Sequence, residues 1–307
     1  MTASPMSAAA TSCSRAGAAR PAGTDRKPAT GPVFFIPMAS SSLSAFGHHS
    51  GRYLAIDGAR IYCEEQGPAD APPLLLLHGG LGSLDGFNRL LPQLQGRFRV
   101  IGMDTRGHGA STMGGQALTY RRLQADAEGV ADQLGLARYS VLGFSDGGVT
   151  GLRLAAAPQS RVDKLVVIGV DWKLAADDPL RKTLSGVTAQ SWEAKFPGTR
   201  KAYEERNPEP DFEAFVKANV ALWLDEGGGN YPDDSIRNIR CELLVVRGDA
   251  DRLTSRALQV ELCEAVAGAH MLSIPFAGHE AHEDAMETVM RSVNRFLQPR
   301  TGKRPAA

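Results

Sequence analysis

The 307-residue chain lacks a surplus of charge of either sign, and it lacks long apolar runs. Basic and acidic side chains number 34 each, so the formal net charge is zero. This balance argues against nucleic acid as a partner, because phosphate binding requires a basic surplus. No apolar run approaches the roughly 18 residues that span a bilayer, and we therefore expect no membrane partner.

Cysteine is scarce as well. The four cysteines, at positions 13, 63, 241 and 263, lie too far apart for a disulfide framework or a zinc-ligand pattern. The simplest interpretation is a reducing compartment, so we expect a cytoplasmic protein. Nothing in the sequence indicates its oligomeric state.

Acidic residues are almost missing from the first 50 positions, where Asp25 is the single one. This stretch is rich in Ala, Ser, Gly, Thr and Pro, and such a segment cannot bury enough apolar surface to fold. Residues 1–50 are therefore predicted to form a disordered N-terminal tail. A transit peptide is the alternative, and Met38 offers a natural later start.

From residue 53 onward, short β-rich runs alternate with helical patterns. Two of these runs predict an antiparallel hairpin that turns at Asp57-Gly58. Further buried strands are predicted at residues 74–77, 98–103, 139–144, 164–170, 242–246 and 271–274. Strands that alternate with helices imply βαβ units. The expected fold class is therefore α/β, with a mostly parallel central sheet flanked by helices.

The alternation lapses over residues 172–234. Prolines at positions 179, 197, 208 and 210 break this stretch into short helices. It also contains all three tryptophans of the chain, Trp172, Trp192 and Trp223. We predict a helical lid here, inserted between two parts of the core at 51–171 and 235–298. At least one tryptophan is expected to line a substrate pocket; the alternative is that all three form the lid's own small core.

The motif with the clearest chemistry is Gly143-Phe144-Ser145-Asp146-Gly147-Gly148. It is G-x-S-x-G between a predicted strand and a helical pattern, the setting of a nucleophile elbow. Ser145 would sit at a strained backbone angle at the tip of the turn, where side chains at the flanking glycines would collide with backbone. The N-terminus of the following helix would favour developing negative charge. Ser145 is therefore the predicted nucleophile.

A second glycine-rich motif, His78-Gly79-Gly80-Leu81-Gly82, follows the strand predicted at 74–77. Glycines let backbone N–H groups approach a substrate oxygen closely. We predict an oxyanion hole from the N–H of Gly80, with Leu81 as the neighbouring alternative, and the N–H of Asp146. His78 and His108 are expected to brace these loops and not to take part in the chemistry.

The general base and its acid should follow Ser145 in the order acid, then histidine. Of the later histidines, His279 lies in a loop after the strand predicted at 271–274 and is the predicted base. Together with His282 it superficially resembles a metal site. The spacing is three and not the four of the zincin motif, and no motif supplies a third ligand, so no metal is expected.

A carboxylate must hold the histidine in one tautomer and stabilise its cation. Three aspartates fit the order: Asp249 and Asp251 after the strand predicted at 242–246, and Asp171 after the one predicted at 164–170. These residues alone leave the choice open.

Together the motifs resemble the α/β-hydrolase superfamily over residues 53–297. The resemblance implies the α/β-hydrolase fold and a serine hydrolase. The family pattern Gly-x-x-Asp falls on Gly248 and Asp251, which favours Asp251 as the acid. The aspartate after the serine resembles that of the biphenyl-hydrolase-like and valacyclovirase-type esterases.

The expected reaction is hydrolysis of a small carboxylic ester or related acyl substrate through an acyl-enzyme, without metal or other cofactor. One alternative is a meta-cleavage-type C–C bond hydrolase with the same Ser-His-Asp triad. Another is a binding protein that uses the pocket as a receptor. The predicted lid has 12 acidic and eight basic residues, so a cationic substrate is conceivable, although a solvated helical face explains the same count.

Overall fold

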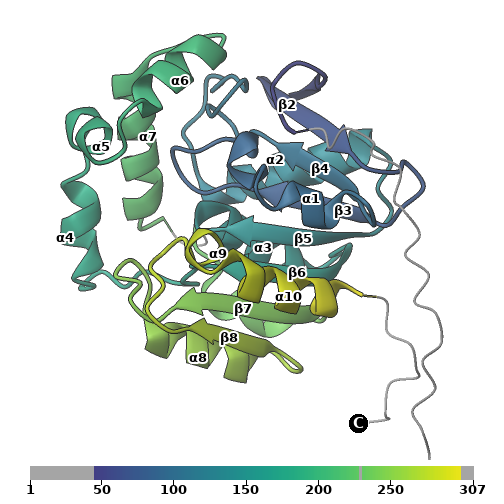
Figure 1. Cartoon of the computed structure of the whole chain (residues 1–307). Coiled ribbons are helices and arrows are strands. Elements are labelled where there is room, and N and C mark those ends of the chain that lie inside the picture. Colours follow the sequence, from purple (N-terminus) through teal and green to yellow (C-terminus); the bar gives the residue numbers. More distant parts are fainter. Residues whose placement is uncertain (1–44, 228–229, 299–307) are drawn as a thin grey trace, which may run out of the picture. The chain divides into compact units, whose positions relative to one another are not determined.

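A computed structural model describes residues 45–227 and 230–298 of the chain. An eight-stranded sheet with the order β1-β2-β4-β3-β5-β6-β7-β8 forms its centre (Figure 1). β2 pairs antiparallel with β1 and β4, and the strands from β4 to β8 pair parallel. The strands are β1 (Arg52–Ile56), β2 (Ala59–Gln66), β3 (Pro73–Leu77), β4 (Arg99–Met103), β5 (Tyr139–Phe144), β6 (Val162–Ile168), β7 (Glu242–Gly248) and β8 (His270–Ile274). The predicted α/β architecture is confirmed.

The predicted hairpin is present, with Ile56 opposite Ala59. Asp57 and Gly58 both have positive φ, 43° and 75°, as the tight turn between twisted strands requires. Several strand boundaries differ from their predictions by one or two residues; β6, for example, ends at Ile168 and not at residue 170. Gly169 has a φ of 58°, a left-handed conformation that breaks the extended backbone.

Alternating strand side chains enter two separate hydrophobic cores, one on each face of the sheet. On β3, Leu75 and Leu77 enter the first core, whereas Leu74 and Leu76 enter the second. The first is closed by α2 (Tyr120–Gln133), α3 (Asp146–Ala156) and α8 (Arg256–Ala265). The second is closed by α1 (Leu91–Leu94), α9 (Ala281–Asp284) and α10 (Met286–Leu297). Burial on both faces explains why these strands are continuous apolar runs in the sequence.

Four helices occupy the stretch predicted to interrupt the alternation: α4 (Leu180–Ser185), α5 (Ala189–Lys195), α6 (Thr199–Arg206) and α7 (Phe212–Leu224). They lie together at one side of the sheet, where Figure 1 draws them in green. The longest, α7, buries Phe212, Phe215 and Leu222 in the first core, whereas α4 buries no residue. Within the described ranges, no helix is long and apolar enough to cross a membrane.

Residues 45–50, which the sequence prediction assigns to the tail, pack against the first strands. Phe46 is 2% exposed, and the N–H groups of Gly47 and His49 donate to the carboxylate of Glu64. The folded part therefore begins before the predicted boundary at residue 50. The rest of the predicted tail lies outside the described residues.

Candidate active site

Ser145 occupies a strained turn between β5 and α3. Its φ of 51° and ψ of −118° are unfavourable for a residue with a side chain, and its N–H donates to the carbonyl of Ile168. A Cβ atom on Gly143 would lie 2.3 Å from the carbonyl oxygen of Gly147, and one on Gly147 would lie 1.9 Å from that of Leu77. Both flanking positions thus require glycine for the steric reason that the motif indicates.

The structure brings three predicted site residues into one hydrogen-bonded chain. His279 Nδ1–H donates to Asp251 Oδ2 at 2.9 Å, and the Ser145 hydroxyl donates to His279 Nε2 at 3.1 Å. The ionised carboxylate can only accept, which fixes this direction of donation. Ser145 comes from the β5–α3 turn, Asp251 from the loop after β7 and His279 from the loop after β8. Such a chain can move a proton from the serine to the histidine.

Asp251 is held as an anion by its own turn. It accepts hydrogen bonds from the N–H of Leu253 at 2.8 Å and the hydroxyl of Thr254 at 2.6 Å. Burial opposes its ionisation, but the hydrogen bonds, that from His279 first, outweigh burial and hold the pKa of Asp251 below its usual value. Asp249 instead pairs with Arg247 at 2.7 Å and accepts from the hydroxyl of Ser273.

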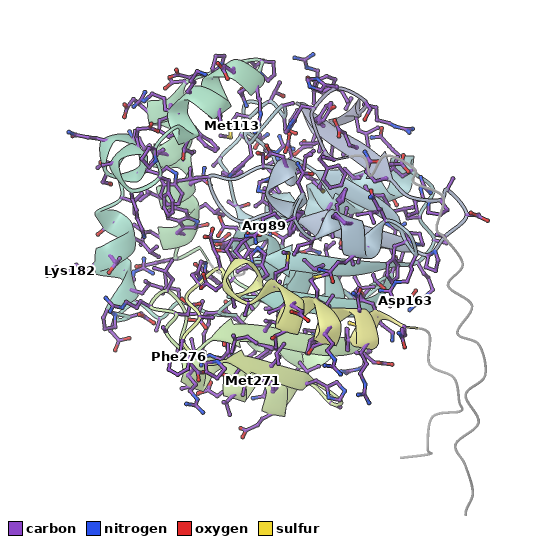
Figure 2. All side chains as sticks on the ribbon, in the orientation of Figure 1. Arg89, Met113, Asp163, Lys182, Met271 and Phe276 are labelled. Carbon is purple, nitrogen blue, oxygen red and sulfur yellow. The ribbon has the colours of Figure 1, made fainter. Side chains whose placement is uncertain are left out.

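The loops that carry the acid and the histidine are packed directly against each other. A Cβ atom on Gly248 would lie 2.1 Å from the carbonyl oxygen of Gly278, and the N–H of Ala250 donates to Ala277. The N–H of Gly278 donates to Asp284 at 2.7 Å. Earlier in the same loop Phe276 is 97% exposed with a φ of 66° (Figure 2). The close backbone contact fixes the distance between Asp251 and His279.

The glycine-rich loop after β3 approaches the nucleophile as expected. A Cβ atom on Gly79 would lie 3.2 Å from the Cβ of Ser145. The N–H of Leu81 donates to His108 Nε2, so it is not available to a substrate. The N–H groups of Gly80 and Asp146 have no acceptor among the residues that the structure describes. The geometry therefore favours Gly80 over Leu81 as the donor from this loop.

The side chain of Asp146 is buried and doubly hydrogen-bonded. Its carboxylate accepts from the Tyr120 hydroxyl at 2.7 Å and from Trp223 Nε1 at 2.8 Å. Burial raises the pKa of Asp146, and the bonds from Trp223 and Tyr120 oppose this shift. These two partners join the elbow to α2 and α7. Sequence reasoning misses Tyr120 and assigns Trp223 only to the lid, because no local motif marks either contact.

His78 and His108 are buried and brace the loops around Ser145. His78 donates to the carbonyl of Gly79 at 2.7 Å and accepts from the N–H of Thr105 at 3.0 Å. Burial lowers the pKa of His78, and it lowers that of His108 to about 3. The side-chain amide of Asn219 on α7 lies 3.1 Å from His108 Nε2. Both histidines are therefore neutral near pH 7 and hold backbone in place.

His282 is a buried neighbour of the nucleophile elbow. Its ring packs on Phe144 at 4.7 Å between centroids, and burial lowers the pKa of His282 to about 4. Across the described part of the chain, no group of three or more His, Cys, Asp or Glu residues could hold a metal ion.

A cavity of about 1020 Å³ opens next to Ser145. Its far wall comes from α4 to α7 and is largely apolar, including Leu184, Val187, Trp192 and Trp223. Trp172 is not part of this wall; its Nε1–H donates to the carbonyl of Leu258. Two of the three tryptophans thus line the cavity, and the third packs on the core.

A serine on a strained strand–helix turn, within reach of a histidine, places the chain in a known class of enzyme fold. The alpha/beta hydrolase fold family model matches residues 72–226. The chain belongs to the α/β-hydrolase fold family, and it is a hydrolase.

The chain is similar to several known proteins. It is 27% identical to mouse serine hydrolase BPHL over 253 residues, which covers 80% of this chain and 85% of that protein. It is 24% identical to esterase YbfF of Escherichia coli K12, covering 73% of this chain and 92% of the other. A solved structure of a hydrolase from Pseudomonas aeruginosa PA01 matches with a TM-score of 0.69 at 22% identity, covering 82% of this chain and all of that one.

Proposed function

We propose that the chain is a serine esterase that hydrolyses small carboxylic esters with Ser145 as nucleophile, His279 as general base and Asp251 as the orienting acid. The observation that carries this proposal is the hydrogen-bonded chain of these three side chains, which opens on a largely apolar cavity. The names of the relatives, serine hydrolase and esterase, agree with it.

The reaction consists of two acyl transfers. His279 takes the proton of Ser145 as the serine oxygen attacks the ester carbonyl. The N–H groups of Gly80 and Asp146 bind the oxyanion. Neither group donates to an acceptor among the described residues. His279 then gives its proton to the leaving alcohol. Water repeats the sequence and releases the carboxylic acid from the serine.

Several charged groups around the cavity are already engaged by protein partners, which favours an uncharged substrate. Asp85 pairs with Arg206 at 2.7 Å, and Lys173 pairs with Glu261 at 3.2 Å. Asp146 already accepts two hydrogen bonds. The acidic surplus of residues 172–234 is assigned to solvated surface and not to recognition of a cation, because none of the acidic residues described in this segment lines the cavity.

Turnover of a panel of substrates tests this function. We expect hydrolysis of uncharged p-nitrophenyl esters, weaker hydrolysis of amino-acid esters with a free ammonium group, and none of a vinylogous diketone. Turnover of the diketone without ester hydrolysis would assign the same three residues to C–C bond cleavage. Binding of esters without any turnover would indicate a receptor.

We further propose that α4 to α7 act as a lid that sets the acyl specificity, and Trp192 provides the test. Trp192→Ala enlarges the cavity and should raise kcat/KM for long acyl chains relative to short ones, by about tenfold. Rates across an ester series from acetate to laurate measure this ratio.

Trp172→Ala is the matched control, because this tryptophan is buried but does not line the cavity. It should lower the melting temperature and leave the ranking of esters unchanged. If the ranking of esters by kcat/KM also stays unchanged in Trp192→Ala, Trp192 only packs among the helices and does not set the acyl specificity.

A further inference from the structure

A second, partly buried carboxyl group lies beside the Ser145–His279–Asp251 chain, and the reaction above does not use it. Asp171 follows β6 and lines the same cavity as Ser145 and His279. Its Oδ2 accepts from the N–H of Ser255 at 2.8 Å. Its Oδ1 is buried and has no hydrogen-bond partner in the described ranges. A half-satisfied buried carboxyl is costly to ionise and calls for an explanation.

Asp171 and Asp251 hold the same turn. Asp251 accepts from the N–H of Leu253 and the hydroxyl of Thr254, and Asp171 accepts from the N–H of the next residue, Ser255. Three consecutive residues thus donate to two carboxyl groups. Ser255 is also the N-cap of α8, so Asp171 fixes the point where this turn enters the helix.

The loop that carries Asp171 also approaches the histidine. A Cβ atom on Gly169, two residues before it, would lie 3.0 Å from Nδ1 of His279. The charged groups that act on Asp171 come from the neighbouring loops: Asp251 and Arg247 at the end of β7, and Asp178 before α4. Tyr231 interacts with it from the segment after α7.

We propose that Asp171 is a positioning residue for acyl transfer: it holds the turn that carries Asp251 and, when ionised, adds a second negative charge beside the Asp251–His279 pair. This inference rests on the proposed serine esterase function. The added charge stabilises the imidazolium that forms when His279 takes the serine proton. Asp171 acts through these two residues and exchanges no proton with the substrate.

The charge is present only over part of the working pH range. Burial raises the pKa of Asp171 to about 7, assisted by repulsion from Asp251 and Asp178 and opposed by the hydrogen bond from Ser255. Below this value the carboxyl is neutral, and above it the carboxyl is an anion. The wild-type enzyme should therefore gain activity as Asp171 loses its proton.

Asp171→Asn separates the charge from the hydrogen bond, because the amide oxygen can still accept from Ser255. The ratio of wild-type to variant kcat/KM should rise by about tenfold between about pH 5.5 and about pH 8.5. A tenfold change corresponds to a charge–charge interaction that shifts a pKa by about one unit, as expected for partly buried groups. Asp177→Asn, which removes an exposed carboxyl from the same loop, should give a ratio that does not vary with pH.

Thermal melting provides the folding control. The unfolded chain releases the Asp171 proton at lower pH than the folded chain, so the wild type loses stability as pH rises from about 4 to about 7. Asp171→Asn lacks this loss and should melt at a higher temperature than the wild type at alkaline pH.

If the ratio of wild-type to Asp171→Asn kcat/KM stays constant with pH, the electrostatic role of Asp171 is overturned. Its role would then be limited to the hydrogen bond with Ser255. Failure of the esterase function is distinguishable from this outcome. It would show as a wild-type enzyme without ester turnover, or as turnover that survives Ser145→Ala.

Discussion

Replacing Ser145 with alanine should lower ester turnover by about 10⁶-fold, the scale reported for loss of the nucleophile in a serine protease. The side-chain oxygen at the tip of the elbow is the atom that forms the acyl bond, and no neighbouring group can replace it. The fold should be retained, because the Ser145 N–H still donates to Ile168 and the side-chain hydroxyl bonds only to His279. Initial rates on an activated ester measure the loss.

Ser145→Cys is the informative companion variant, because it keeps a nucleophile of different chemistry at the same strained position. It should form an acyl-enzyme with an activated ester and release it slowly. Circular dichroism shows whether both variants fold. Rapid turnover by a folded Ser145→Ala protein would mean that another residue performs the chemistry.

Replacing Asp251 with asparagine should lower turnover by about 10⁴-fold, as the equivalent change does in a serine protease. Asparagine keeps the size of the side chain, but it can donate a hydrogen bond to His279 Nδ1 and so favours the wrong tautomer. The pH dependence of stability should change too. The pKa of Asp251 lies below its usual value, so the carboxylate contributes stability above the usual aspartate pKa, and this contribution is lost as pH falls through the lower, folded value.

Asp249→Asn is the matched control for Asp251→Asn, because the two aspartates lie in one loop. Asp249 pairs with Arg247 and accepts from Ser273, and it takes no part in the hydrogen bonds that join Ser145, His279 and Asp251. Its replacement should cost far less activity than that of Asp251. Near-wild-type turnover by Asp251→Asn, together with collapse in Asp249→Asn, would reassign the acid.

Much of the fold follows from local sequence because local physics decides it. Strands buried on both faces must be continuous apolar runs, and β3 and β5 therefore stand out. The elbow is local in part: the backbone of Gly147, four residues away, excludes a side chain at Gly143, whereas the backbone of Leu77 on β3 excludes one at Gly147. Ser145 and the order of acid and histidine follow from the same motif.

The contacts that complete the site join distant parts of the chain, and no hydrophobic periodicity in the sequence predicts them. The choice between Gly80 and Leu81 depends on His108, which is 27 residues from Leu81. The bond from Trp223 to Asp146 spans 77 residues. Asp171 and Ser255 are separated by 84 residues, so sequence alone offers Asp171 only as a rival to Asp251. Tertiary packing supplies this information, and the structure distinguishes the three aspartates by their partners.

The central claim is that Ser145 is a nucleophile activated by His279, and covalent labelling tests it most directly. The wild-type protein is treated with a fluorophosphonate, and the modified peptide is located by mass spectrometry. We predict a single adduct on Ser145, strongly reduced labelling in His279→Ala and none at this position in Ser145→Ala. A wild-type protein that hydrolyses esters while its Ser145 stays unlabelled, or that carries the adduct on another residue, would contradict the account.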